Sequence, residues 1–292
     1  MSKELDILQL ADDYKKVTYK DAEAYLIINK KMEKYNCLFG FIDFPNDYET
    51  AKGLFDELEK EAAARGYHHL VGPVNYCTWM TYRWAISNFD FKLFPDCNNP
   101  SYYPEMIEKL GYSQLYTYRS ALIDTNNPLY AAGSLILKQK EKEGFKFKLY
   151  EKEEMYSMVR EVYDISIDAF RGSNLYCDIP FEAFREGYLT WTYGLESAMF
   201  IAYDGDTPIG YVYGYKNPFG DQFIAKTTAV KKEYQKNKIY VALLYLGCNY
   251  VMQKGYNETL YHFQNEQKST FKRYSEDIES NEKRYAVYIK EF

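Results

Sequence analysis

A lysine-rich segment stands between an apolar strand and an apolar helix in the C-terminal half of the chain. Residues 223–230 (FIAKTTAV) predict a β-strand, residues 231–238 (KKEYQKNK) a polar loop, and residues 239–254 a mostly buried α-helix. Gly255 follows that helix as a C-terminal signal. The first turn of a helix carries unpaired backbone N–H groups and a positive dipole end, so the end of this loop could bind an anion.

The lysines of this loop have two interpretations. They could pair with phosphate groups, or they could form an ordinary solvated surface loop. We weigh the two equally, because the position before a helix itself favours anions. The lysines are Lys231, Lys232, Lys236 and Lys238.

Histidine and cysteine residues show no metal-ligand spacing in the sequence. His68 and His69 are adjacent, so they point to opposite faces of a strand. His262 is isolated on a short predicted strand, where a histidine is more often structural than catalytic. The five cysteines form no C-x-x-C pair, which argues against a zinc site and against a disulfide framework. We therefore expect no metal.

Aromatic residues cluster after the tetrapeptide Gly72-Pro73-Val74-Asn75. They could wall a substrate pocket between two halves of the protein, since ligand sites favour domain interfaces. They could also pack that interface without binding anything, which is the simpler interpretation. The residues are Trp79, Tyr82, Trp84 and Phe89.

The elements around the lysine loop alternate between strands and helices. Two β-rich runs flank Asp204-Gly205-Asp206 and predict a hairpin. Apolar residues at helical spacing predict a helix over residues 153–169. The other predicted elements are strands at 145–150, 259–263 and 284–290, a short helix after Pro180 and a helix at 268–278.

The N-terminal half repeats the end of this order. Its predicted elements are a strand at 38–44, a helix at 48–65, a strand at 69–71, a helix at 100–110 and a strand at 115–123. Gly66 and Gly111 follow the two helices. Both halves thus run strand, loop, helix, glycine, strand, loop, helix, strand, which indicates a diverged internal duplication in an α/β protein. We expect domains at residues 1–128 and 144–292, with a charged linker at 129–143.

Residues 145–292 resemble a GNAT-type N-acyltransferase domain over most of their length. In that family one strand diverges from its neighbour, and the following loop and helix start hold the pyrophosphate of coenzyme A. The phosphate loop of the family reads Gln/Arg-x-x-Gly-x-Gly/Ala. The segment 235–240 matches the glutamine, but Lys238 and Tyr240 replace the two glycines.

The resemblance implies a set of site residues. The cofactor-binding residues would be Val230, Gln235, Lys236, Asn237, Lys238, Ile239, Tyr240 and Asn265. Tyr274 stands where the family places the tyrosine that protonates the departing thiolate; packing on an amphipathic helix is the alternative. Asn265 could instead cap the next helix. The general base is not identified.

The N-terminal half resembles a group of bacterial tandem GNAT-like proteins. The shared motifs are Gly72-Pro73-Val74-Asn75, Phe89-Asp90, Asn99-Pro100-Ser101-Tyr102-Tyr103 and Gly111-Tyr112. Between its strand and helix this half has only Pro45-Asn46-Asp47, with no phosphate-loop glycine. The resemblance implies two GNAT-like domains, each a twisted mixed β-sheet flanked by helices.

Composition excludes several classes of protein. A net charge of −6 without a basic run argues against a nucleic-acid partner. The N-terminus lacks an apolar signal region, and no stretch reaches the ~18 apolar residues of a membrane helix. We therefore expect a cytoplasmic protein with no membrane partner. Aromatic residues make up 18% of the chain, which could line clefts or reflect a compositional bias.

Three functions remain after this comparison. The first is transfer of an acyl group from acetyl-CoA or another acyl-CoA to the amine of a small molecule or peptide. The second is a catalytically inactive GNAT-like scaffold that binds a ligand or a protein, as the absent loop glycines suggest. A Fem-type aminoacyl transferase ranks last, because the sequence shows no helical-hairpin insertion and no basic stripe. Neither the acceptor nor the oligomeric state follows from the sequence.

Overall fold

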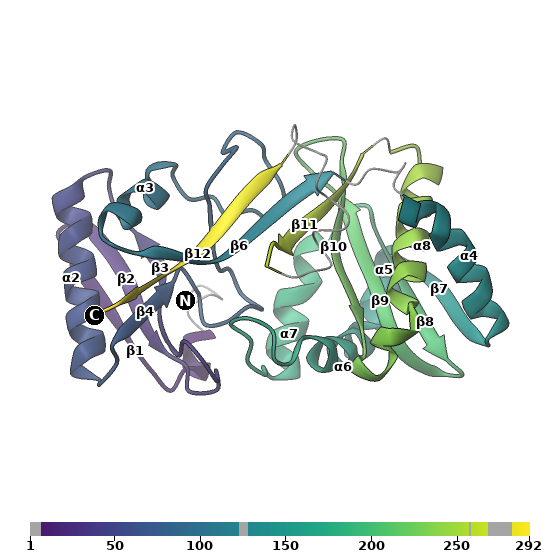
Figure 1. The fold of residues 1–292 in the computed structure, drawn as a ribbon, viewed down its shortest axis with the longest axis horizontal. Helices are drawn as coiled ribbons and strands as arrows, with labels where there is room; N and C mark the ends of the chain where they lie inside the picture. The colour runs from purple at the N-terminus through teal and green to yellow at the C-terminus, as the bar shows by residue number, and fades with distance from the viewer. Residues whose placement is uncertain (1–6, 123–127, 257, 268–281) are drawn as a thin grey trace.

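The computed structural model describes residues 7–122, 128–256, 258–267 and 282–292. Within this part of the chain, helices pack against one twelve-stranded mixed sheet (Figure 1). The α/β class predicted from the sequence is therefore confirmed. The helix predicted at 268–278 lies outside the described residues.

The N-terminal half begins with a short 3₁₀ helix at Leu8–Leu10. Its long helix forms where predicted, because the Asp47 side chain accepts a hydrogen bond from the Thr50 amide at 2.8 Å and caps the first turn. In chain order the elements are β1 (Asp13–Tyr19), β2 (Ala22–Ile28), β3 (Cys37–Asp43), α2 (Tyr48–Ala64), β4 (His69–Gly72), β5 (Trp84–Ala85), α3 (Tyr102–Lys109) and β6 (Ser113–Leu122). The sequence analysis did not identify the hairpin β1–β2.

The C-terminal half also follows the predicted order. The Asp-Gly turn joins two strands in register, with Asp204 opposite Thr207. In chain order the elements are β7 (Phe145–Glu151), α5 (Lys152–Ser157), α6 (Val159–Phe170), α7 (Phe181–Tyr188), the 3₁₀ helix η2 (Thr190–Thr192), β8 (Ser197–Asp204), β9 (Thr207–Lys216), β10 (Phe223–Val230), the 3₁₀ helix η3 (Lys232–Asn237), α8 (Ile239–Gln253), β11 (Thr259–Asn265) and β12 (Lys283–Glu291).

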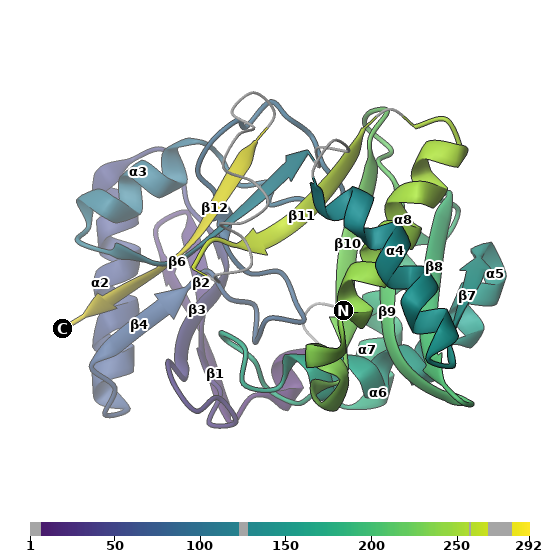
Figure 2. The same cartoon turned by 45° about the vertical axis from the view of Figure 1, so that its right-hand side comes forward.

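A helix occupies most of the segment that the charge pattern assigns to a linker. This helix, α4 (Pro128–Lys142), lies alongside α8 (Figure 2). A Cβ atom on Gly133 would come within 2.6 Å of the Tyr245 side chain, so the two helices approach closely at this glycine. The segment between the halves is therefore packed against the C-terminal half.

The two halves exchange their last strands. The sheet order is β1-β2-β3-β4-β12-β6-β11-β10-β9-β8-β7, and β5 also pairs with β12. The neighbours of β6 are β12 and β11, which both come from the C-terminal half. The strands beside β12 are β4, β5 and β6, which all come from the N-terminal half. Figure 1 shows β6 and β12 crossing the centre of the molecule together.

The central part of β12 is fully buried in the sheet. Tyr285, Ala286, Val287 and Tyr288 of β12 have no exposed surface. Val287 pairs with Tyr116 of β6, and Ile289 pairs with Val71 of β4. The domain boundaries at residues 128 and 144 stay predictions, but strand pairing crosses both of them.

No helix in the described part of the chain combines the length and the apolar character that crossing a membrane requires.

We predict that neither half folds alone. A fragment of residues 1–143 would leave β6 without a neighbouring strand, and a fragment of residues 144–292 would do the same for β12. The intact chain should unfold in one cooperative transition followed by near-UV circular dichroism. Each fragment should lack that transition, and mixing or co-expressing the fragments should restore it. A cooperative transition in either isolated fragment would contradict the strand exchange.

Candidate functional site

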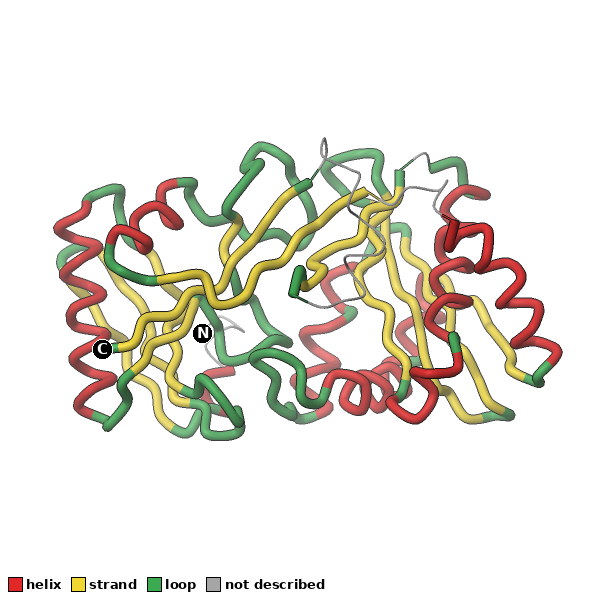
Figure 3. The backbone as a smooth tube through the Cα atoms, in the orientation of Figure 1, coloured by secondary structure: helices red, strands yellow, loops and turns green. Residues whose placement is uncertain are grey.

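The strands β10 and β11 diverge. They pair in parallel at only three positions, of which the last joins Ala225 to Tyr261. Strand β10 then continues to Val230 and β11 to Asn265. A bulge at Lys226 interrupts the pairing of β10 with β9, and β11 pairs with β6 at its far end. The tube in Figure 3 shows the two strands separating toward the lysine loop.

The lysine loop turns into α8 through a left-handed residue. Residues 232–237 form the 3₁₀ helix η3, and Lys238 has φ +59° as the N-cap of α8. Lys238 stands where the acyltransferase loop has its first glycine, a residue that adopts this conformation without a Cβ penalty. The loop therefore bends as a glycine would allow, although glycine is absent. Tyr240, at the second glycine position, is exposed on the first turn of α8.

Three hydrogen bonds that involve side chains of the described residues attach the loop to its surroundings. The side-chain amide of Gln235 donates to the Val230 carbonyl at 3.1 Å, which closes the loop onto the end of β10. The Lys232 amide donates to the Asp168 carboxylate of α6 at 2.6 Å. The Tyr234 hydroxyl donates to the Asp204 carboxylate at 2.9 Å. Lys236 and Lys238 extend into solvent from this fixed backbone.

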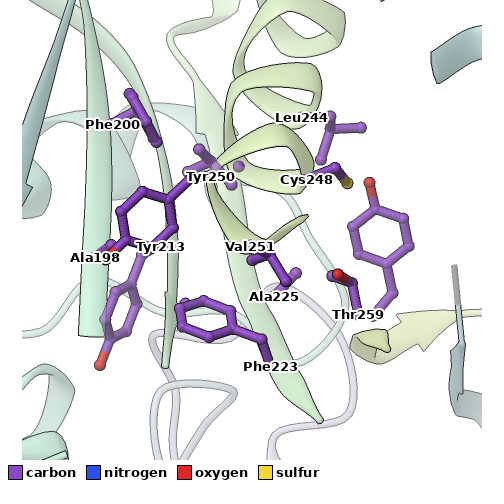
Figure 4. Close-up of a pocket in the computed structure, with 14 residues that line it drawn as sticks. Ala198, Phe200, Tyr213, Phe223, Ala225, Leu244, Cys248, Tyr250, Val251 and Thr259 are labelled. Carbon is purple, nitrogen blue, oxygen red and sulfur yellow. The ribbon is translucent and has the colours of Figure 1, made fainter. Parts of the chain in front are cut away.

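A small apolar cavity lies between α8 and the sheet. Phe200, Tyr213, Phe223, Cys248 and Tyr250 are among its lining residues (Figure 4). Its volume is about 20 Å³, which is room for about one water molecule. Burial raises the pKa of the Cys248 thiol to about 11, so this cysteine stays protonated at neutral pH. The cavity is part of the packing of α8 and is too small for a cofactor arm.

A second, larger cavity lies at the boundary between the halves. Its volume is about 370 Å³, within the range of small-molecule sites. The turn between β2 and β3 contributes residues 32–35, and the segment after α6 contributes residues 171–176 and Asp178. Tyr116 of β6 completes the lining. Trp79, Tyr82 and Trp84, three of the aromatic residues predicted to wall a substrate pocket, do not line it.

Those three aromatic residues separate in the structure. Trp79 packs edge-on against Phe184 of α7 and donates its indole N–H to the Cys177 carbonyl at 2.9 Å. Tyr82 lies against Tyr118. Trp84 is 5% exposed and belongs to the core of the N-terminal half. Their substrate-binding role stays a prediction; only Trp79 contacts the helical layer of the C-terminal half.

The predicted cofactor residues lie on the two sides of the gap. Val230 ends β10, and the segment 235–240 forms the loop and helix start described above. Asn265 ends β11, where its side-chain oxygen accepts a hydrogen bond from the Gln267 amide at 2.8 Å. Asn265 therefore stabilises a local turn. Tyr274, the predicted proton donor, lies outside the described residues.

His262 has both ring nitrogens engaged. Nε2 lies 2.7 Å from the Pro95 carbonyl, which can only accept, so this nitrogen carries the proton. Nδ1 then accepts from the Ser120 hydroxyl at 2.8 Å. Burial, followed by the nearby charges of Lys226 and Arg83, holds the pKa of His262 well below its usual range. His262 is therefore a neutral structural residue.

Lys226 is a site residue that the sequence analysis missed. Its side chain is half-buried at the bulge, and Nζ lies 5.0 Å from the centre of the Phe263 ring. Burial first, and repulsion from Arg83 second, lower the pKa of Lys226 to about 7. A signal was available, because a lysine in the middle of an apolar strand has to bury its stem.

The lowered pKa of Lys226 predicts a pH-dependent cost to folding. The unfolded chain binds more protons than the folded one between pH 7 and about 10.5, so this cost is full below pH 7 and falls as pH rises. Lys226→Met should increase the free energy of unfolding by about 1–3 kcal/mol at pH 6.5 and by less at pH 9.5. Urea unfolding across this range would measure the effect. Lys146→Met, at an exposed position of β7, is the control; equal pH slopes in Lys226→Met and the unsubstituted protein would contradict the prediction.

Part of the sequence matches a known protein family. Residues 159–274 match the model of the acetyltransferase (GNAT) family. No curated protein sequence matches the chain. A solved tandem GNAT protein from the clavulanic acid biosynthesis pathway aligns with 92% of this chain and 78% of its own, with a TM-score of 0.50 and 10% identity.

A second solved structure shows the same fold. It is a conserved protein of unknown function from Enterococcus faecalis V583, described as a probable N-acyltransferase. It aligns with 92% of this chain and 59% of its own, with a TM-score of 0.52 and 9% identity. At such identity these likenesses concern the fold alone. The chain therefore shares the fold of a solved tandem GNAT protein, and residues 159–274 match the model of the acetyltransferase (GNAT) family.

Proposed function

We propose that this protein transfers an acyl group from acetyl-CoA or another acyl-CoA to the amine of a small molecule or peptide. The observation that supports the proposal most is the left-handed Lys238 at the end of the gap between β10 and β11. The loop keeps the bend of a phosphate-binding turn although both glycines are replaced. A lysine in this conformation carries a Cβ penalty that a glycine would not.

The residues around the gap fit coenzyme A. The start of α8 offers backbone N–H groups and a positive dipole end to a pyrophosphate. Lys236 and Lys238 are exposed beside it and can pair with phosphate oxygens. At the other end of the loop the Lys232 amide already donates a hydrogen bond to the Asp168 carboxylate. The anion would therefore lie toward residues 237–240. The free edge of β10 up to Val230 would face the pantetheine arm.

The reaction requires two proton transfers. A C–N bond forms and the C–S bond of the thioester breaks, so the amine loses a proton and the departing thiolate gains one. Lys226 is our candidate for the amine proton, because its pKa of about 7 suits a base at neutral pH. Tyr274, by its family position, is our candidate for the proton donor. Coenzyme A supplies the activated acyl group when it is bound.

We expect acetyl-CoA and free coenzyme A to bind with micromolar affinity in calorimetric titration. Gln235→Ala should weaken binding, because the loop would lose its attachment to the Val230 carbonyl. Replacing Lys236 and Lys238 together by alanine should weaken it about 10-fold at low salt and less at high salt. Lys254→Ala, just after the far end of α8 and paired with Glu151, is the matched control. Absence of binding at millimolar ligand would favour the inactive scaffold.

Lys238→Gly should stabilise the protein. Relief of the left-handed conformation contributes about 1–2 kcal/mol, and the flexibility of glycine in the unfolded chain offsets about half of it. Lys236→Gly, within η3, has no such relief and should destabilise by about 0.5–1 kcal/mol. Thermal unfolding of both variants would compare them. A loss of stability in both would show that the Lys238 side chain makes a contact worth more than the strain.

A further inference from the structure

Arg83 is buried, and no charged side chain of the described residues forms an ion pair with it. It is 6% exposed and lies after β4, in the segment that leads into β5. Its guanidinium carbon lies 3.7 Å from the ring centre of Tyr82, 4.4 Å from that of Tyr118 and 3.8 Å from that of Phe263. The three rings hold the guanidinium group in one orientation.

One nitrogen of this guanidinium group, Nη1, makes no hydrogen bond to the described residues. Nε of Arg83 donates to the Tyr82 carbonyl at 3.1 Å. Nη1 is buried and makes no hydrogen bond, and no carboxylate of the described residues forms an ion pair with Arg83. A buried cation without an anion is costly, and arginine presents a fork that matches a carboxylate. The described residues around Arg83 therefore provide no anion that pairs with its charge.

Further positive charge surrounds the same place. Lys226 lies near Arg83, and both lower the pKa of His262. Lys283 is buried too, but Asp96 pairs with it at 2.5 Å. The neutral His262 adds no negative charge. An anion bound at Arg83 would balance the charge of its buried guanidinium group.

The backbone at this place is also unusual. Arg83 has φ +75° and Phe263 has φ +56°, and neither is a glycine. Non-glycine residues in left-handed conformations carry strain that is often retained at ligand sites. Phe263 stands two residues beyond Tyr261, the last point where β11 pairs with β10. Arg83 therefore lies against the strand that borders the gap.

We propose that Arg83 binds the carboxylate of the acceptor, which is an amino acid or a short peptide with a free amine. This inference rests on the proposed acyl transfer at the neighbouring gap and names its substrate class. The less buried side of the guanidinium group is that of Lys226 and Phe263, whose side chains are half-buried, whereas Tyr82 and Tyr118 are buried.

The same charges would prepare the amine for attack. A cation near Arg83 and Lys226 is destabilised, as the lowered pKa values of Lys226 and His262 show. An acceptor amine placed there would lose its proton at lower pH than it does in water. Its neutral form is the nucleophile.

The test is calorimetric titration with the free-acid forms of the twenty standard amino acids and of glycylglycine, each compared with its C-terminal amide. At least one acid should bind, and its amide should bind on the order of 10- to 100-fold more weakly. Arg83→Gln should abolish this preference, and Arg83→Lys should restore part of it. Arg284→Gln is the control, since Arg284 is exposed and paired with Glu266. Circular dichroism would establish that each variant is folded.

Two results would overturn the inference. One is that no acid binds at millimolar concentration, and the other is that acid and amide bind equally. Retention of the preference by a folded Arg83→Gln would also contradict the inference. If Arg83→Gln does not fold, the acid and amide pair in the unsubstituted protein still decides. A separate titration of the unsubstituted protein with acetyl-CoA reports on the proposed function, independently of the comparison between acid and amide.

Discussion

The pairing of β6 with β12 is the interaction on which the rest of the structure depends. Each strand has neighbours only from the other half, so the two halves share one sheet. This pairing fixes the N-terminal half against the gap between β10 and β11. It is the reason that Arg83, which follows β4, contacts Phe263 of β11. Side chains from distant parts of the sequence thus meet in a rigid setting, which a flexible linker would not provide.

Charge near the gap is distributed unevenly. The lysine loop carries its charges in solvent, where screening makes each of them worth little alone. Arg83 and Lys226 carry theirs in a place of low polarity, where each charge has a larger effect on its neighbours. The first arrangement suits a polyanion that approaches from solvent, and the second suits a small anion that leaves water. The proposed reaction has a large donor, acyl-CoA, and a small acceptor, so it would use both the exposed and the buried charges.

Local features of the fold could be predicted from the sequence, and long-range pairing could not. The helix α2 and the hairpin β8–β9 depend on Asp47 and on an Asp-Gly turn, which act within a few residues. The alternation in residues 284–290 predicts a strand whatever its neighbour is, so it carries no information about the exchange. The charges that suggested a linker belong to the end of α4, which packs on α8 through Gly133.

The candidate site also has one part that could be predicted from the sequence and one part that could not. Its loop could be located because lysines before an apolar helix are visible in the sequence, and the resemblance supplied the cofactor. Arg83 could not be identified from the sequence, because its partners Tyr82, Tyr118 and Phe263 come together only in the folded sheet. Trp79 and Trp84 are five residues apart, yet they pack in different layers, since β5 turns Trp84 into the N-terminal core.

The strand exchange also has a consequence for synthesis of the protein on the ribosome. Strands β4 and β6 emerge early, but β12, which lies between them, emerges among the last residues of this chain. Until then both strands have unpaired edges, which are prone to join other chains. The N-terminal part of the sheet is therefore complete only after β12 has emerged. Strand edges that stay unpaired during synthesis are among the features that make a partly folded chain prone to aggregate, and chaperones protect such chains.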